Sequence, residues 1–219
     1  LVHRVHQEGR RYAEAGFDVV LIGHQGHAEV EGTQGQIPGR VQVIAQAHEV
    51  ADLMVADPDK VAYVTQTTLS LDDTAEIVAA LKARFPNIVS PHKQDICYAT
   101  TNRQEAIKAI SPTVDAVIVV GSPNSSNSQR LREVAERAGC PVARLVLRTD
   151  EIDWSVFGNI RSLGITAGAS APEVLVEEII DAFAARYEVR VETVSTADEN
   201  VFFPLPRELR GEATPDAAE

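Results

Sequence analysis

A single cysteine in the middle of the chain, Cys97, stands where a metal ligand would be expected. It belongs to the string DICYATTNRQ (residues 95–104) and opens a stretch with helical character. The unpaired backbone N–H groups at a helix start carry partial positive charge, which favours the thiolate that binds metals. The alternative interpretation is that Cys97 is a small buried hydrophobic side chain.

A histidine- and glycine-rich string, GHQGHAEVEGTQGQ, also has residue types suited to chemistry. His27 and Glu29 are spaced for a hydrogen-bonded pair, and His24 would add a third zinc ligand. Neither a fourth ligand nor an HExxH pattern accompanies them, which argues against zinc. A loop whose polar side chains only satisfy backbone groups would have the same composition.

Hydroxyl and amide side chains collect before two expected helices. Ser125, Ser126 and Asn127 precede one of them, and Ser170 precedes the other. Together with the N-terminal backbone N–H groups, such side chains can hold phosphate oxygens. Helix capping alone would explain the same residues, and the two roles are compatible.

The composition narrows the class of protein. The chain has 219 residues, 44% of them hydrophobic and 24% charged, as in a globular protein of one or two domains. A net charge of −12 argues against nucleic acid, so an anionic substrate must be bound locally. No apolar run approaches a membrane span and the start is no secretory signal, so we expect a cytoplasmic protein without membrane contact. In the reducing cytoplasm we expect no disulfide between Cys97 and Cys140, and we expect Cys140 to pack in the core.

Apolar runs alternate with helical stretches along the whole chain. This alternation is typical of parallel βαβ units, in which ligands gather at the carboxyl ends of the strands. We expect a polar loop after the first strand, and one or two short strands beyond Glu188 before a frayed end. The expected strands are residues 17–23, 41–46, 60–69, 114–121, 141–146 and 161–168, and the expected helices are 2–15, 48–54, 71–85, 97–110, 129–138 and 171–187.

The two halves of the chain repeat one plan. The strand-ending glycines Gly23 and Gly121 lie 98 residues apart, and Thr65 and Thr166, at the ends of later strands, lie 101 apart. Moving back 98 residues from Cys97 leads to a position two residues before the start of the chain. We therefore expect a cysteine upstream. Three such lobes would bring three cysteines to one iron–sulfur cluster, leaving a fourth iron free for substrate.

Five strings in the chain closely resemble the LytB/IspH family of 4-hydroxy-3-methylbut-2-enyl diphosphate reductases. They occur in the family's order and cover nearly the whole chain, which makes them far more specific than any one motif. The strings are GHQGHAEVEGTQGQ, VTQTTLSLDDT, DICYATTNRQ, VVGSPNSSNSQRL and TAGASAP, at residues 23–36, 64–74, 95–104, 119–131 and 166–172.

The resemblance implies the last step of the non-mevalonate isoprenoid pathway. This step is a two-electron removal of the hydroxyl of an allylic alcohol diphosphate, which gives isopentenyl and dimethylallyl diphosphates, with electrons from a ferredoxin or flavodoxin. The family has a pseudo-threefold α/β fold of three lobes around a 4Fe–4S cluster on three cysteines. Residues 1–94 would be the second lobe, 95–195 the third and 196–219 a C-terminal tail, and the first lobe would be missing with two cluster cysteines.

The resemblance also implies a role for each candidate residue. Glu29 matches the family's proton donor, and Thr67 would lie near the substrate hydroxyl and relay the proton. Cys97 would bind the cluster, with two further cysteines upstream. The diphosphate would be bound by His27, Ser125, Ser126, Asn127 and Ser170. A second hypothesis is a cluster-free diphosphate-binding fragment, or one part of a split protein, without reductase activity of its own.

Overall fold

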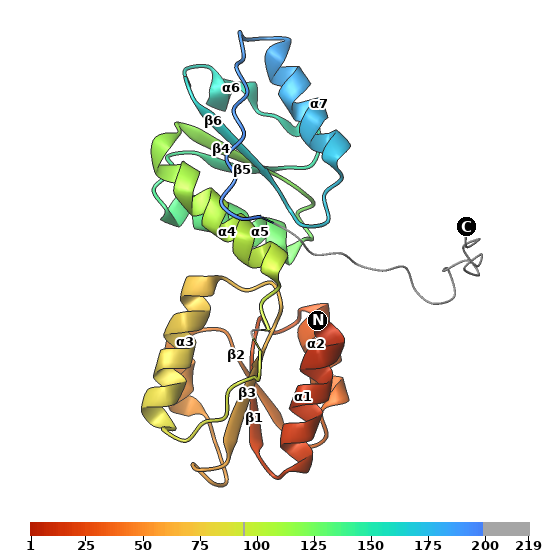
Figure 1. Cartoon of the computed structure of the whole chain (residues 1–219), viewed down its shortest axis with the longest axis vertical. Helices are drawn as coiled ribbons and strands as arrows, with labels where there is room; N and C mark the ends of the chain where they lie inside the picture. Colours follow the sequence, from red (N-terminus) through yellow and green to blue (C-terminus); the bar gives the residue numbers. More distant parts are fainter. Residues whose placement is uncertain (94, 199–219) are drawn as a thin grey trace, which may run out of the picture.

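The chain folds into two α/β lobes stacked end to end, each built on a three-stranded parallel sheet (Figure 1). The computed structural model describes residues 1–93 and 95–198. We call the lobe with strands β1–β3 the N-lobe and the lobe with β4–β6 the C-lobe. The centre strand of each sheet is its first in sequence, with orders β2-β1-β3 and β5-β4-β6, so the predicted repeat is confirmed.

The N-lobe sheet is buried on both faces, as parallel sheets require. Alternate residues of β1 point to opposite sides: Val20 and Ile22 pack with α3 and η1, whereas Val19 and Leu21 pack with α1 and α2. The elements are α1 (Val2–Glu14), β1 (Asp18–Ile22), α2 (Ala28–Gln36), β2 (Val41–Ile44), the 3-10 helix η1 (Ala47–Asp52), β3 (Val61–Thr65) and α3 (Leu71–Arg84).

The C-lobe repeats this layered arrangement. Val117 and Val119 of β4 pack with α4 and α5, and Ile118 and Val120 pack with α6 and α7. The elements are α4 (Tyr98–Ile110), η2 (Ser111–Thr113), β4 (Ala116–Val120), α5 (Ser126–Arg137), β5 (Ala143–Val146), η3 (Thr149–Glu151), α6 (Trp154–Phe157), β6 (Leu163–Ala167) and α7 (Glu173–Ala184).

Three expectations about the elements were wrong. The segment after β1 is not wholly a loop, because His27 caps helix α2 and Val30 and Thr33 pack inward. Helix α5 begins at Ser126, three residues earlier than expected, because the Ser125 hydroxyl caps it. Residues 188–198 contain no strand, and the rest of the expected tail lies outside the described residues. Among the residues that the structure describes, no helix is long and apolar enough to cross a membrane.

One buried side chain, Gln104 of α4, ties the two lobes together. Its Nε2 donates to the carbonyl of Leu69 (2.8 Å) and its Oε1 accepts from the N–H of Leu71 (3.0 Å), at the start of α3. Gln104 is fully buried, so water cannot replace its side chain as the partner of these two backbone groups. The amide therefore fixes the end of α4 that follows Cys97 against the N-lobe.

Replacing Gln104 with alanine should lower the free energy of unfolding by about 2 kcal/mol or more, because two backbone groups lose their buried partner. The matched control is Gln42→Ala. Gln42 makes the same pair of bonds, to the N–H and carbonyl of Met54, but in an exposed place where water can replace it. Its loss should cost less than about 1 kcal/mol. Denaturant unfolding measures both, and equal losses would contradict the bridging role.

Candidate functional site

The carboxyl ends of the two sheets meet at the junction between the lobes, and the predicted site residues lie on the segments that follow them. Short loops leave each buried strand there and lead into a helix. This edge is where parallel sheets bind their ligands. Glu29 follows β1, Thr67 follows β3, Ser125, Ser126 and Asn127 follow β4, and Ser170 follows β6.

Glu29 and Thr67 are in direct contact. The Glu29 carboxylate accepts two hydrogen bonds from Thr67, from its N–H (2.8 Å) and from its hydroxyl (3.0 Å). Glu29 is held in the first turn of α2, and Thr67 is almost wholly buried, so the pair has one geometry. The arrangement gives a carboxyl group a hydroxyl neighbour through which a proton can pass.

The predicted pairing of the His27 and Glu29 side chains was wrong. His27 is the N-cap of α2, and its Nδ1 accepts from the backbone N–H of Glu29 (3.2 Å), while the Glu29 carboxylate faces Thr67. A neutral imidazole that accepts through Nδ1 carries its proton on Nε2. His27 therefore keeps a ring N–H donor for another partner.

Cys97 lies beside the same threonine. Its backbone N–H donates to the carbonyl of Thr67 (3.0 Å), and its own carbonyl accepts from Thr101 in the first turn of α4. The thiol is half-buried and takes no part in capping the helix. Contacts thus run from Glu29 through Thr67 to Cys97, as expected of residues that share one site.

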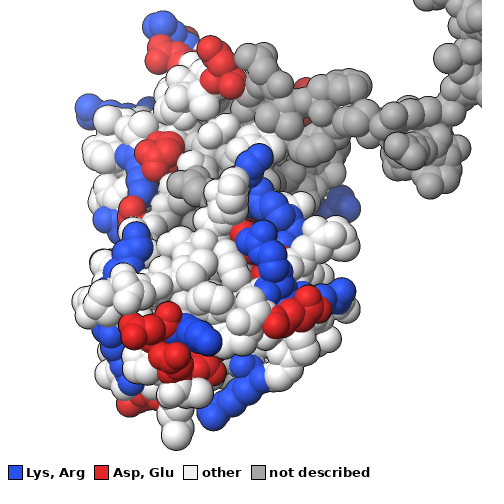
Figure 2. Space-filling view, turned by 60° about the horizontal axis from the view of Figure 1, so that its bottom comes forward, with Lys and Arg blue, Asp and Glu red and all other residues white. Residues whose placement is uncertain are grey.

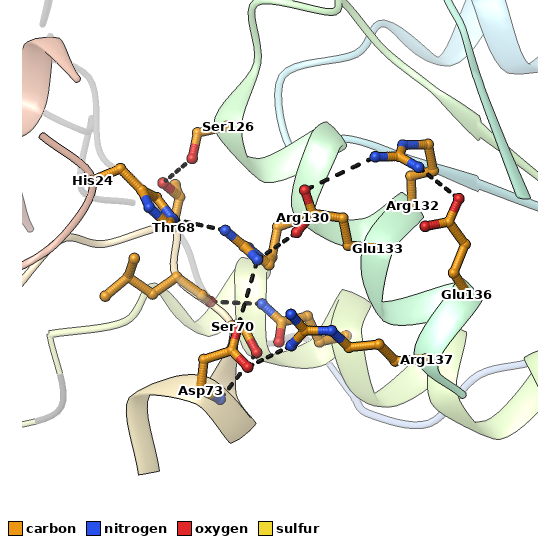
Figure 3. A network of polar contacts seen from close by, with 12 residues as sticks. His24, Thr68, Ser70, Asp73, Ser126, Arg130, Arg132, Glu133, Glu136 and Arg137 are labelled. Carbon is orange, nitrogen blue, oxygen red and sulfur yellow. Dashed lines mark hydrogen bonds and ion pairs between the residues drawn. The ribbon is translucent and has the colours of Figure 1, made fainter. Parts of the chain in front are cut away.

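Of the two serines at the start of α5, Ser126 bonds to the N-lobe and Ser125 caps the helix. The hydroxyl of Ser126 accepts from Thr68 (3.1 Å) and from Nε2 of Gln66 (3.3 Å), as Figure 3 shows for Thr68. Ser125 caps α5 by accepting from the N–H of Ser128 (3.3 Å). The predicted capping role of Ser125 is thus confirmed, and Ser126 is held at the junction between the lobes.

Asn127 is the least satisfied polar side chain of the site. It is 6% exposed, and neither its amide oxygen nor its amide nitrogen has a hydrogen-bond partner. The start of α5 packs so closely on the strand ends that a Cβ at Gly121 or Gly168 would meet the Ser128 hydroxyl at 2.2 or 2.1 Å. A buried amide without partners in such a cradle is suited to a polar ligand, because its desolvation is already a cost of the folded chain and a ligand would restore the missing hydrogen bonds.

Replacing Asn127 with leucine should leave the free energy of unfolding unchanged or raise it by about 1 kcal/mol, because an unpaired buried amide is removed. The same change should weaken binding of inorganic pyrophosphate. Asn124→Leu, in the exposed loop before α5, is the control and should leave that affinity unchanged. Calorimetry with pyrophosphate and denaturant unfolding test both effects. A clear loss of stability in N127L would show that the amide has a structural partner.

Ser170 lies apart from these contacts. It is exposed in the loop between β6 and α7, and no hydrogen bond joins its side chain to another predicted site residue in the described ranges. It shares only its place at the carboxyl end of a strand. The structure therefore brings together Glu29, Thr67 and Cys97, and also Ser125, Ser126 and Asn127, while Ser170 stays at the edge.

His24 belongs to a separate ionic network beside the site (Figure 3). Its Nε2 lies 2.7 Å from Nη2 of Arg130, whose Nη1 contacts both Asp73 and Glu133. Burial, and then the positive charge of Arg130, lower the pKa of His24, so its ring is neutral and accepts. His24 thus does not join Glu29 in a zinc site, and the described residues contain no group of three His, Cys, Asp or Glu suited to a metal.

Three residues at the junction escaped the sequence analysis. Gln66 is 1% exposed and connects the N–H of His24 with Thr68 and Ser126, and Arg130 connects α5 with α3. Gln66 and Thr68 flank Thr67 in the string VTQTTLSLDDT, so their position in that string was a usable signal. Arg130 lies in the string VVGSPNSSNSQRL, so its position in that string was a usable signal as well.

Cys97 is the one thiol of this chain suited to a cluster. Cys140 is 6% exposed in the C-lobe core, where its Sγ donates to the carbonyl of Val142 (3.2 Å), so its predicted packing role is confirmed. The half-buried thiol of Cys97, beside Thr67 at the lobe junction, fits a cluster ligand in type and place. A cluster held by three cysteines would need two thiols from outside these 219 residues.

Comparisons with known proteins identify the family of the chain. The model of the LytB protein family matches residues 1–184. A 4-hydroxy-3-methylbut-2-enyl diphosphate reductase of Beijerinckia indica is 64% identical over 98% of this chain and 67% of its own length. Reductase 1 of Bradyrhizobium diazoefficiens is 63% identical over 97% of this chain and 66% of its own length.

A solved structure extends the agreement to the fold. The E-1-hydroxy-2-methyl-but-2-enyl-4-diphosphate reductase from Plasmodium falciparum superposes with a TM-score of 0.89 at 34% identity, over 94% of this chain and 65% of that protein. The chain thus spans about two thirds of the length of these relatives. On the family match, on the identities and on the shared fold, the chain belongs to the LytB protein family.

Proposed function

We propose that this chain provides the proton donor, part of the diphosphate site and one cluster ligand of a 4-hydroxy-3-methylbut-2-enyl diphosphate reductase. The observation that carries the proposal is the run of contacts from Glu29 through Thr67 to Cys97, across the lobe junction from the unpartnered Asn127. The names of the relatives state the reaction. The contacts assign residues to the proton donor, the diphosphate site and the cluster ligand that this reaction requires.

The reaction needs a proton at the leaving oxygen. The carbon–oxygen bond breaks, two electrons and two protons are consumed, and the hydroxyl departs as water, leaving a carbon–hydrogen bond. Glu29 supplies the proton to that oxygen, and the Thr67 hydroxyl, 3.0 Å from the carboxylate, relays it. A 4Fe–4S cluster held in part by Cys97 would supply the electrons one at a time, with two further cysteines contributed from upstream.

The diphosphate needs many neutral donors, because the protein as a whole is acidic. The backbone N–H groups at the start of α5 bear partial positive charge and favour an anion. Ser125, Ser126 and the Asn127 amide add donors there, and His27 adds its ring N–H from the N-lobe. Ser170, exposed after β6, would reach the diphosphate from the next strand. The site is thus assembled from both lobes.

The proposed activity implies a substrate, an electron donor and a cellular location. The substrate is a small allylic diphosphate, and the electrons come from a ferredoxin or flavodoxin in the cytoplasm. The regions 1–94, 95–195 and 196–219 are the second lobe, the third lobe and a C-terminal tail of the three-lobe fold. Neither nucleic acid nor a membrane takes part, consistent with the net charge of −12.

Anaerobic reconstitution with iron and sulfide tests the proposal. The protein carrying all three lobes should hold about four irons and four sulfides per chain and should oxidise reduced viologen only when 4-hydroxy-3-methylbut-2-enyl diphosphate is added. The 219-residue chain alone should show little turnover, because it supplies one thiol to the cluster. A three-lobe protein with a full cluster but no substrate-dependent oxidation would overturn the proposed activity.

The alternative is a diphosphate-binding fragment without a cluster, or one part of a split protein. One observation favours it: the site contains a single cysteine, since Cys140 is buried in the core. Pyrophosphate binding by a chain that takes up no iron, alone or mixed with any separate first lobe, would support this alternative. A Cys-Pro pair immediately before Leu1, with another cysteine far upstream, would support the reductase.

A further inference from the structure

A hollow of about 340 Å³ lies against α1 on the side of the N-lobe where the chain passes towards α4. It is formed by one face of the helix and by the segment that leaves the N-lobe sheet. Positive charge dominates its lining, with three Lys or Arg side chains against one carboxylate. The lining residues are Arg4, Gln7, Glu8, Arg11, His92 and Lys93.

The buried carboxylate of Glu8 fixes the shape of this hollow. Glu8 is 6% exposed and accepts from the N–H of His92 (2.8 Å), from Arg11 (3.3 Å) and from the Tyr12 hydroxyl (3.3 Å). The single proton of the Tyr12 hydroxyl is shared between Glu8 and the carbonyl of Ser90 (3.0 Å), which is the nearer acceptor. The segment with His92 is thus tied to α1 at two points, so the rim of the hollow is preformed.

The charges of the rim are only partly neutralised. Arg4 pairs with Asp95 at 3.4 Å and Arg11 pairs with Glu8. Lys93 is exposed and takes part in none of the ion pairs found among residues 1–93 and 95–198. Figure 2 shows Lys and Arg side chains gathered in a stripe on the side of the N-lobe where α1 lies in Figure 1.

The hollow is connected to the proposed redox site. Asp95, the partner of Arg4, also accepts from the N–H of Thr65 at the end of β3 (3.1 Å). Two residues further along each segment, the N–H of Cys97 donates to the carbonyl of Thr67. Lys93 precedes Cys97 by four residues, which span at most about 14 Å of extended chain. A protein seated on the hollow therefore approaches the Cys97 side of the site.

We propose that this hollow is the docking site of a small acidic electron-transfer protein. The chain carries 32 Asp and Glu against 20 Lys and Arg, so its overall field repels an acidic partner and a local basic rim decides where one lands. Each docked carrier gives one electron and leaves oxidised, so two dockings supply the two electrons consumed per hydroxyl removed. The inference rests on the proposed function, which requires such a reductant.

Binding of an acidic plant-type 2Fe–2S ferredoxin to the purified chain at low salt tests the docking site. Lys93→Glu should raise the Kd about five-fold or more, because a rim charge is reversed. Arg11→Gln should raise it in the same direction by a smaller factor. The matched control is Lys60→Glu, which makes the same change in net charge at an exposed residue next to the amino end of β3. Added salt should weaken the wild-type complex.

Two results would overturn the docking site: no measurable binding of the ferredoxin by the wild-type chain, or equal weakening by K93E and K60E. The second would mean that only the overall charge matters. Iron and sulfide content is measured separately in the three-lobe protein and reports on the proposed function. A three-lobe protein that takes up no cluster would refute the proposed reductase activity. If the protein holds the cluster but K93E binds ferredoxin as tightly as the wild type, only the docking site is refuted.

Discussion

Replacing Glu29 with glutamine should lower turnover of the three-lobe protein by a factor of about 100 to 10,000, the usual contribution of a positioned general acid. Glutamine has nearly the same shape and no acidic proton. The cluster's visible absorption should stay the same, because Glu29 contacts Thr67 through its side chain and does not contact Cys97 directly. The loss should therefore appear in kcat rather than in cofactor content.

The geometry indicates why the folded structure survives this change. The side-chain oxygen of glutamine can still accept from the N–H of Thr67, and its amide nitrogen can donate to the Thr67 hydroxyl. Both contacts of Glu29 thus keep a partner, which avoids the cost of a buried unpaired group. What E29Q removes is the proton transferred through the pair.

Glu31→Gln is the matched control for this experiment. Glu31 lies two residues further along α2 in the same first turn, and its side chain is exposed. The two variants change the net charge and the helix start equally, so only the contact with Thr67 differs. Undiminished turnover in E29Q would remove Glu29 from the proton-donor role, and equal losses in E29Q and E31Q would point to the field at the start of α2 instead.

The sheets were predictable because buried parallel strands have a strong sequence signal. Residues 19–22 and 116–120 are apolar at every position, since both faces of each sheet are covered, and the spacing of the strand ends revealed the repeat. Helix α2 was missed because its composition is that of a loop. Its sequence contains Gly32 and Gly35, and it is held by its cap and by the burial of Val30 rather than by an apolar stripe.

The site was predictable as a set of residues but not as a set of contacts. The family strings identified Glu29 and Thr67, and their contact follows from the pairing of β1 with β3. The bonds from Thr68 to Ser126 depend on how one lobe rests on the other, which periodicity does not encode. Predicting contacts between the two lobes requires knowing how the lobes are arranged in space. The pairing of His24 with Arg130 is another such contact.

Replacing Cys97 with alanine should abolish the intact cluster in the three-lobe protein, with loss of most of the iron and sulfide, because one of three thiolate ligands is removed. The fold should be retained. The structural contacts of Cys97 are made by its backbone, with its N–H on the Thr67 carbonyl and its carbonyl accepting from Thr101, and its side chain makes no capping bond. The free energy of unfolding of the 219-residue chain should therefore change by about 0.5 kcal/mol or less.

Cys140→Ala separates the loss of a ligand from the loss of a thiol. Cys140 is buried among Val134, Ala135 and Ala143, so its removal should lower stability by about 1 kcal/mol and leave iron and sulfide unchanged. The two variants should thus have opposite effects: C97A loses the cluster and keeps stability, whereas C140A loses stability and keeps the cluster. Undiminished iron and sulfide in C97A would rule out Cys97 as a ligand. The contacts from Glu29 through Thr67 would then lead to a diphosphate site without a redox centre, which is the alternative function.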